Sequence, residues 1–391
     1  MKFLGYERAD KSVGIRNKIL IVSVDECCDG IARKIAENSE NSVVLTNWYA
    51  CMLGGNEETL NQMIEVAKSP NVASVIVIAM GCGSILPEQV ADPIKLINKP
   101  VEILTCQKEG GTKKTIKNGI SIITEMDKYI STLKRKEFSL DKLIVGVKCG
   151  GSDTSSGIAS NPSVGEAVDK LVDMGATCIA GELFELIGCN EILNKRAVSN
   201  EIAAKINQLI ENEEKRWSIE GTDIETMSIG NSIGGLTTIE EKSLGALHKT
   251  GSRPIQDVLQ INKDFIEKPQ KPGFYLSETT MLCGGAGVNF ASLGAHIILW
   301  TSGAAGFNNS IVPVIRVSGN YDLMNDDIDV DVSNIMSGTM GVDEASNIIL
   351  EKVISVANGE ATSIEDYGDS TMTLYQKDQR VETLLSLKYV K

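Results

Sequence analysis

The feature that most constrains the fold is a regular alternation of apolar runs and helical patterns between residues 19 and 133. Apolar runs at 19–24, 43–46, 75–80 and 101–104 are followed by helix-like patterns at 29–37, 57–67, 86–97 and 112–133. Strands that are apolar on both faces and alternate with helices predict a parallel sheet covered on both sides. We therefore expect a small doubly wound α/β domain.

A polar, charged segment at 134–141 (KRKEFSLD) interrupts the pattern and is the expected linker. Beyond it the pattern restarts, with strands expected at 143–147, 178–180, 274–276, 297–301 and 312–317 and helices near 168–174, 198–217, 238, 287–293 and 342–358. The predicted fold is α/β, with two doubly wound (Rossmann-like) domains and mainly parallel sheets. Residues 1–135 form a flavodoxin-like domain that we also consider for dimerisation, and 136–391 form the larger catalytic domain.

Composition excludes several classes of protein. The 38 Lys+Arg and 52 Asp+Glu give a formal charge of −14 without a basic cluster, which argues against a nucleic-acid partner. No apolar run reaches the roughly 20 residues of a membrane span, and the first residues are charged where a signal peptide is apolar. We expect a cytoplasmic protein. Its nine scattered cysteines contain no CxxC pair, so neither a disulfide framework nor a structural zinc site is expected.

The segment 148–165, KCGGSDTSSGIASNPSVG, contains four glycines and five serines directly behind an apolar run. Glycine lets a backbone approach a ligand closely, and serine supplies small hydroxyl groups. A helix expected to begin near Asn161 and Pro162 would direct its N-terminal amides at the same place. The segment predicts a site for an anionic ligand; the alternative is a turn that serves chain geometry alone.

Five motifs in order resemble the altronate and galactarate dehydratases and their sulfolactate sulfo-lyase relatives. They are GYERADKSVGIRNKILIV near the start, KCGGSDTSSGIASNPSVG, GELFELIG followed by LNKRA, GNSIGGLTTIEEKSLGALHKTGS, and VPVIRVSGN followed by MNDDIDVD. The resemblance implies a metal-dependent lyase that acts on hydroxy acids. It also implies that this chain is a large subunit, whose partner is a small β-clip subunit.

Removing a proton next to a carboxylate requires a group that absorbs the enediolate charge, and a divalent cation can do so. Glu182 and Glu185, three residues apart after an expected strand, are the predicted metal ligands, with Cys149 and Cys51 as soft ligands. Fe(II) is the expected metal, while oxygen ligands alone would suit Mg, Mn or Ca. The alternatives are a solvated carboxylate pair and buried, structural cysteines. Cys27, Cys51 and Cys82 follow strands of the first domain, so an iron site there is a further alternative.

Lys242 is the predicted general base, because burial lowers the pKa of a lysine towards neutrality. An ordinary solvated lysine on a helix surface is the alternative. His248 and Glu241 are further acid–base candidates.

Polar residues of the motifs are the predicted substrate contacts: Lys148, Gly150, Gly151, Ser152, Asp153, Ser155, Asn231, Thr237, Arg316 and Asn320. Asp153 has capping of the following turn as its alternative role. Arg316 lies in an apolar strand, so it needs a buried partner. That partner is either a substrate carboxylate or one of Asp326, Asp327 and Asp329.

Three positions depart from the family pattern: Asn47 replaces a histidine, Glu278 an aspartate and Ala304 an arginine. All three follow strands, where ligands bind in α/β proteins. The leading hypothesis is a hydro-lyase that removes water from altronate or galactarate to give a 2-keto-3-deoxy acid. The alternatives are sulfite elimination from sulfolactate and a diverged subunit that binds acids without converting them. We also expect a homo-oligomer.

Overall fold

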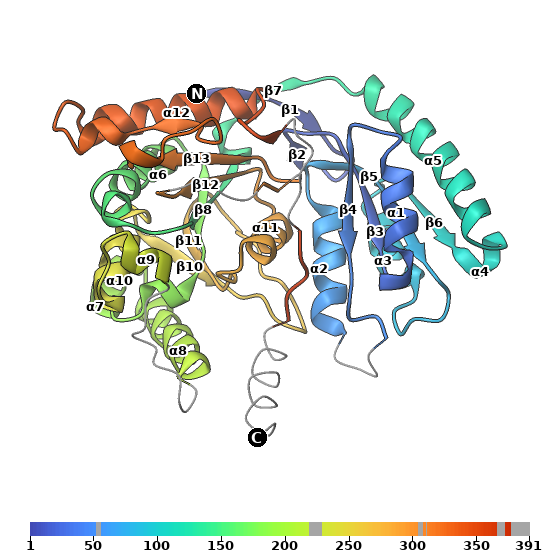
Figure 1. Cartoon of the computed structure of the whole chain (residues 1–391), viewed down its shortest axis with the longest axis horizontal. Coiled ribbons are helices and arrows are strands. Elements are labelled where there is room, and N and C mark those ends of the chain that lie inside the picture. The colour runs from blue at the N-terminus through green and yellow to red at the C-terminus, as the bar shows by residue number, and fades with distance from the viewer. Residues whose placement is uncertain (52–55, 219–228, 304–307, 310, 366–371, 377–391) are drawn as a thin grey trace.

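The computed structural model describes residues 1–51, 56–218, 229–303, 308–309, 311–365 and 372–376 (Figure 1). Its smaller domain is built on a four-stranded parallel sheet in the order β4-β3-β5-β6. The strands are β3 Lys18–Ser23, β4 Ser42–Thr46, β5 Val72–Ala79 and β6 Val101–Thr105; the helices are α1 Asp29–Ala36, α2 Glu57–Lys68, α3 Pro87–Lys95, α4 Cys106–Glu109 and α5 Thr112–Thr132. The predicted doubly wound domain is confirmed. All eight residues of β5 are buried, as expected for a strand covered on both faces.

The larger domain is built on a seven-stranded sheet in the order β10-β11-β9-β8-β12-β13-β14, in which every neighbouring pair is parallel. Its strands are β8 Ile144–Cys149, β9 Thr177–Ala180, β10 Ile255–Leu259, β11 Gly273–Ser277, β12 Ile297–Thr301, β13 Val314–Ser318 and β14 Val330–Asp331. The chain leaves β8 towards β9 on one side and adds β12 on the other. The carboxyl end of β8 is therefore a topological switch point, where α/β proteins bind ligands.

Helices cover both faces of this sheet. They are α6 Asn161–Asp173, α7 Asn190–Arg196, α8 Asn200–Trp217, α9 Ile229–Ile233, α10 Ile239–His248, α11 Cys283–Ser292 and α12 Val342–Ala357. One apolar core joins the sheet to α6 and α12, and a second joins its other face, through α11, to the smaller domain. The predicted parallel α/β architecture is confirmed for the second half of the chain as well.

A small antiparallel sheet, not predicted from the sequence, joins the two halves. Its order is β2-β1-β7, with β1 Lys2–Glu7, β2 Val13–Gly14 and β7 Lys136–Ser139. The predicted linker at 134–141 therefore contains a strand. Arg135 donates hydrogen bonds to the carbonyl oxygens of Leu4, Ile15 and Ala357 and fixes the chain at this point.

Residues 372–376 form a strap between α2 of the smaller domain and α11 of the larger (Figure 1). The side-chain amide of Gln62 on α2 pairs with the backbone of Tyr375: its Nε2 donates to the carbonyl oxygen at 2.5 Å, and its Oε1 accepts from the amide at 3.2 Å. Gly285 on α11 leaves room for the strap, because a Cβ there would lie 3.3 Å from the Cβ of Tyr375. The strap thus packs the two domains together.

Within the described ranges, no helix is both long enough and apolar enough to cross a membrane. All nine cysteines are unpaired thiols.

Candidate active site

The serine- and glycine-rich segment begins at the switch point of the larger sheet. Lys148 and Cys149 are the last residues of β8, in register with Trp300 and Thr301 of β12. Gly150 follows where a Cβ would lie 2.3 Å from the indole nitrogen of Trp300, so only glycine fits. The segment continues into a π-helical turn, Ser156–Ser160, and then into α6.

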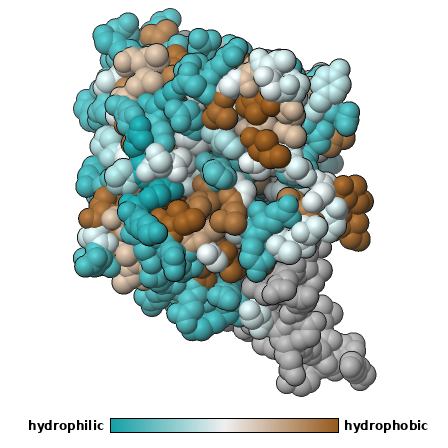
Figure 2. All heavy atoms as spheres, turned by 90° about the vertical axis from the view of Figure 1, so that its left-hand side faces the viewer, coloured by the Kyte–Doolittle hydropathy of each residue, from teal (hydrophilic) through white to brown (hydrophobic). Residues whose placement is uncertain are grey.

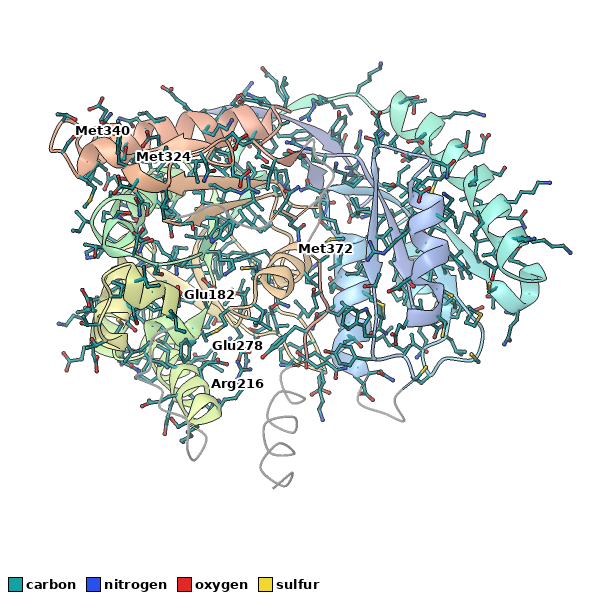
Figure 3. All side chains as sticks on the ribbon, in the orientation of Figure 1. Glu182, Arg216, Glu278, Met324, Met340 and Met372 are labelled. Atoms are coloured by element: carbon teal, nitrogen blue, oxygen red, sulfur yellow. The ribbon has the colours of Figure 1, made fainter. Side chains whose placement is uncertain are left out.

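Glu182 brings a carboxylate to the end of β8. It follows β9 and has φ of +66°, a backbone conformation that is costly for a residue with a side chain. The Nζ of Lys148 donates to its Oε1 at 2.5 Å, and the backbone amide of Cys149 donates to its Oε2 at 3.0 Å. All three residues are buried, and in Figure 3 Glu182 lies inside the larger domain. The strained turn therefore directs the carboxylate into the sheet end.

Glu185 lies one turn further along the chain. It binds Lys242 on α10 and Lys249, which directly follows that helix. Its Oε1 accepts from Lys242 Nζ and its Oε2 from Lys249 Nζ. Lys249 Nζ also lies 3.7 Å from Glu182 Oε2, so it links the two carboxylates. Glu182 and Glu185 thus both contact Lys249, and the charges facing the two carboxylates are three lysines.

The mutual attraction of these groups keeps them charged. Burial lowers the pKa of Lys242, but the Glu185 carboxylate and Cys149 together raise it, and the net shift is upward. Burial also lowers the pKa of Lys148 and Lys249. Glu182 and Cys283 raise it for Lys148, Glu185 and Cys149 raise it for Lys249, and both net shifts are upward. Burial favours neutral Glu185, yet Lys242 and Lys249 hold its pKa well below the ordinary value. The expectation of a lysine with a lowered pKa is therefore wrong, because Lys242 is an ammonium group.

We call Lys148, Glu182, Glu185, Lys242 and Lys249 the charge cluster. Three ammonium groups and two carboxylates leave one positive charge in excess, in surroundings where an uncompensated charge is costly. The thiol of Cys149 and the hydroxyl of Ser152 border it: Ser152 Oγ lies 3.1 Å from Cys149 Sγ and accepts from Lys242 Nζ at 3.3 Å. The cluster is suited to the carboxylate of a substrate.

Asp153 holds the segment that covers the cluster. Its Oδ1 accepts hydrogen bonds from Ser155 Oγ and from the amide and hydroxyl of Ser156, at 2.6 to 3.0 Å. Its Oδ2 accepts from Asn320 Nδ2 at 2.7 Å, which connects the segment to the loop after β13. Asn231 accepts from the amide of Ser152 at 3.2 Å and adds a contact from α9. Asp153 thus caps the turn, the alternative role considered above.

A small cavity opens beside this network, with a volume of about 210 Å³. Ser152, Asp153 and Lys242 line it, together with Gly157 and Leu236. It leads towards the side of the cluster where Lys242 meets Ser152. Gly151, also a predicted contact, accepts a hydrogen bond from the amide of Gly303 and shapes the loop through its backbone.

Arg316, Thr237, Glu241 and His248 are predicted site residues that lie outside the charge cluster, although Glu241 lines the small cavity beside it. Arg316 is buried and pairs with Asp329, one of the two partners expected for it, at 3.4 Å. The carboxylate of Glu241 accepts from the amide and hydroxyl of Thr237, so both residues serve the start of α10. His248 is exposed on α10. The two positions that depart from the family pattern and are described here, Asn47 and Glu278, accept backbone hydrogen bonds, while Ala304 lies outside the described residues.

The arrangement offers no ready place for a divalent metal. All four carboxylate oxygens of Glu182 and Glu185 accept from N–H donors, and the ammonium groups repel a dication. Among the described residues, no group of three His, Cys, Asp or Glu side chains is placed to hold a metal ion. Cys51 lies after β4 in the smaller domain, and Cys149 is the last residue of β8 in the larger. The metal therefore stays a prediction, and we derive no chemical step from it.

Lys249 is the site residue that sequence reasoning missed. It lies seven residues after Lys242, which is nearly two helical turns, so the two side chains share a face. That spacing could have identified it. The partner 64 positions away, Glu185, could not be identified by spacing.

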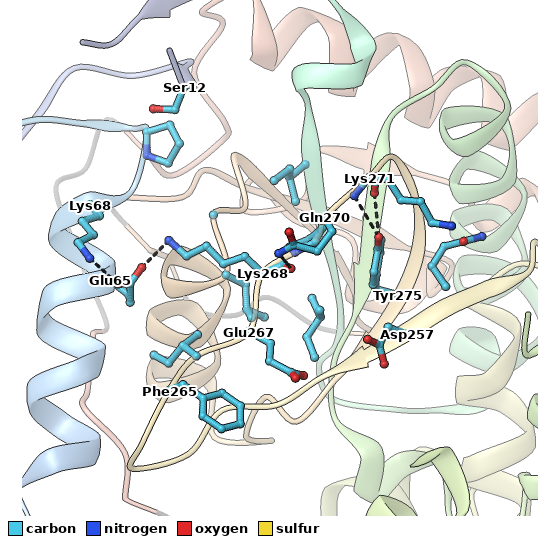
Figure 4. A pocket seen from close by; sticks show the side chains of 18 of the residues that line it. Ser12, Glu65, Lys68, Asp257, Phe265, Glu267, Lys268, Gln270, Lys271 and Tyr275 are labelled. Atoms are coloured by element: carbon cyan, nitrogen blue, oxygen red, sulfur yellow. Dashed lines mark hydrogen bonds and ion pairs between the residues drawn. The ribbon is translucent and has the colours of Figure 1, made fainter. Parts of the chain in front are cut away.

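A larger cleft of about 930 Å³ lies between the two domains, away from the cluster (Figure 4). Its charged lining residues are largely paired: Glu65 binds Lys68 and Lys268, and Lys205 binds Asp257 and Glu267. None of the predicted site residues lines this cleft. We therefore take the charge cluster with the small cavity beside it, and not this larger cleft, as the candidate active site.

Comparison with known proteins identifies the class of this protein. Residues 140–380 match the model of the D-galactarate/altronate dehydratase C-terminal domain, and residues 5–131 match the second domain of D-galactarate dehydratase/altronate hydrolase. The (2R)-sulfolactate sulfo-lyase subunit beta of Chromohalobacter salexigens is 33% identical over 95% of this chain and 96% of its own length.

Two longer relatives match as well. Altronate dehydratase of Bacillus subtilis is 31% identical over 82% of this chain, and the match spans 66% of that protein. Galactarate dehydratase (L-threo-forming) of Escherichia coli is 28% identical over 93% of this chain and 74% of its own length. The matched relatives are dehydratases and a sulfo-lyase, so the protein is a lyase. The chain belongs to the D-galactarate/altronate dehydratase family, as the five motifs predicted.

Proposed function

We propose that this protein eliminates water from a hydroxylated sugar acid such as altronate or galactarate, to give a 2-keto-3-deoxy acid. The observation that carries the proposal is the single excess positive charge of the buried cluster at the switch point. A substrate carboxylate would compensate that charge. The family of dehydratases to which the chain belongs supports the reaction class.

In this proposal the lysines act as fixed positive charges. A water molecule in the small cavity takes the proton next to the carboxylate, and the negative charge left on the two carboxylate oxygens is stabilised by the preorganised ammonium groups as it develops. Lys242 borders the small cavity and contacts Ser152, so it is the member of the cluster nearest the opening. We assign to its Nζ the proton that the departing hydroxyl needs to leave as water.

The divalent metal implied by the resemblance remains part of the proposal. A bound divalent cation would supply Lewis-acid stabilisation of the enediolate. Its requirement is tested by metal analysis of the purified protein and by turnover with Fe(II) or with a chelator. Turnover that is unchanged after complete metal removal would reject it.

Sulfite elimination from sulfolactate is the second candidate. The nearly full-length match to a sulfo-lyase beta subunit favours it. It requires the same proton loss, but the carbon–sulfur bond breaks and its electron pair leaves with sulfite. On the same ground we propose that the chain works with a second, smaller subunit. The resemblance identifies that subunit as a β-clip protein. We further propose that the assembly is oligomeric and cytoplasmic.

The experiment that tests the function incubates the protein with hexonates, hexarates and sulfolactate, with its second subunit added. It measures 2-keto acid and sulfite. Lys242→Met should abolish product, while Lys205→Met, which alters a lysine outside the cluster, should not. Acid-dependent thermal stabilisation without product from any acid would favour the diverged binding subunit.

A further inference from the structure

Six exposed, large apolar or aromatic side chains lie on the side of the molecule that carries α9 and α10. Figure 2 shows this side, where apolar side chains stand among hydrophilic ones. We call the six the mouth patch: Ile158 (53% exposed), Ile229 (81%), Ile233 (82%), Leu244 (51%), Tyr321 (79%) and Leu323 (46%). They come from four segments: the π-helical turn, α9, α10 and the loop after β13.

These four segments meet around the opening of the candidate active site. Ile158 lines the small cavity together with Lys242. A Cβ on Gly234, next to Ile233, would lie 2.7 Å from the Cβ of Asp153, so the end of α9 touches the site loop. Asn320, next to Tyr321, donates to Asp153. The four segments therefore place the mouth patch beside the entrance to the cluster.

Neither α9 nor the loop after β13 buries these residues within the described part of the chain. Helix α9 contains no buried residue, although isoleucines begin and end it. A short helix with exposed isoleucines gains little stability by itself, since helices in proteins are stabilised by packing an apolar face. Contiguous exposed apolar surface commonly marks an interaction site.

Charge indicates which kind of partner fits. Acidic residues border the mouth patch: Glu240 and Glu241 at the start of α10, and Asp322 and Asp326 beyond β13, all exposed. A second copy of this chain, with a formal charge of −14, would bring acidic residues against acidic residues in a symmetric contact. A different chain with an apolar patch and a basic border is complementary.

We propose that the mouth patch is the docking surface for the second subunit, which covers the entrance to the charge cluster. The proposal rests on the proposed function, which includes that subunit. Docking there would exclude water from the cluster and strengthen its electrostatic action on the substrate. The proposed partner presents an apolar surface bordered by lysine or arginine.

The test measures binding of a small β-clip protein, the second subunit of the proposed assembly, by calorimetry with the full-length protein. Ile233→Asp and Leu244→Asp place a charge in the mouth patch. Leu96→Asp is the matched control, because Leu96 is 83% exposed but follows α3 in the smaller domain. Unchanged thermal unfolding of all three variants would show that they fold.

We expect both patch variants to bind at least about tenfold more weakly, and the control to bind within about twofold of the unmodified protein. Equal binding by all four proteins, or no binding by any, would overturn the proposal. Loss of self-association in Ile233→Asp, measured by light scattering without partner, would also overturn it in favour of a second copy.

Failure of this proposal is distinguishable from failure of the proposed function. If product forms but the patch variants bind the second subunit as tightly as the unmodified protein does, the docking surface is rejected and the lyase function is retained. If the patch variants bind the second subunit more weakly but no acid is converted, the docking surface is retained and the lyase function is rejected.

Discussion

The two parallel sheets of this molecule end in different ways. At the carboxyl edge of the smaller sheet, hydrogen bonds between loops prevail: Asp25 accepts from the amide of Met80 at 2.7 Å, and Ser84 donates its amide to Ala50 at 2.9 Å. At the same edge of the larger sheet, four buried charged side chains and the partly buried Lys242 lie together. Parallel topology creates both edges, but only the larger one concentrates charge where a carboxylic acid can use it.

The contrast predicts which residues matter for turnover. Replacing Lys242 by Met removes the proposed proton donor, so kcat should fall by about 10² to 10⁴, the usual contribution of acid–base catalysis. The measurement is initial-rate formation of 2-keto acid. Lys205→Met is the control and should retain nearly full activity, since Lys205 pairs with Asp257 and Glu267 outside the cluster. An equal loss of activity in both variants would contradict a specific role of Lys242 in turnover.

Stability should also depend on the charge cluster. Glu185→Gln leaves the ammonium groups of Lys242 and Lys249 buried with one carboxylate fewer. We expect the free energy of unfolding to fall by about 3 to 5 kcal/mol, as when one partner of a buried ion pair is removed. Urea denaturation measures it, with Glu240→Gln, an exposed neighbour on α10, as control. A change below about 1 kcal/mol would contradict the ion pairs described here.

At the opposite end of the larger sheet, where the strands begin, the buried ionisable group is a neutral histidine. His296 is buried before β12, where its Nδ1 accepts from the amide of Ile144 at 2.9 Å and its Nε2 lies 2.6 Å from the carbonyl oxygen of Val13. Burial lowers its pKa from 6.5 to about 4. Because the unfolded chain binds this proton at higher pH, the histidine's contribution to stability is lost as pH falls from 6.5 towards 4.

The expected loss is about 3 kcal/mol over that range. Urea denaturation between pH 4 and 7 measures it. His296→Gln should show a shallower dependence on pH than the unmodified protein. Parallel curves for the two proteins would assign the dependence to other groups.

The smallest expected effect concerns thiols. Cys27, Cys51 and Cys82 are exposed at the edge of the smaller sheet, whereas Cys149 is buried beside the cluster. Alkylation of the folded protein, followed by mass spectrometry, should modify the three exposed thiols at least about tenfold faster than Cys149. Urea-unfolded protein is the control, in which all four should react alike. Faster labelling of Cys149 would mean that the cluster is open to solvent.

Local patterns predicted most of the fold, because alternating strands and helices in an α/β domain are each coded by adjacent residues. The prediction missed β1 and β7, since their pairing joins residues more than about 130 positions apart and β7 is short and charged, and it missed β2, which has only two residues. It also treated 134–141 as a linker for that reason.

The candidate site was predicted in part. Lys148, Ser152, Glu182, Glu185 and Lys242 came from motifs and do meet in the structure. The charge state of Lys242 was missed, because it depends on Glu185, which lies 57 positions away and was assigned to a metal. A pKa depends on distances in space, which motif spacing does not supply.

Because Glu185 binds two lysines, the order in which these residues can be replaced during evolution is restricted. Replacement of Glu185 alone raises the excess positive charge of the cluster from one to two, so that intermediate in a stepwise exchange is unstable. Among descendants of this gene, Glu185 should therefore be lost only together with at least one of its two lysines.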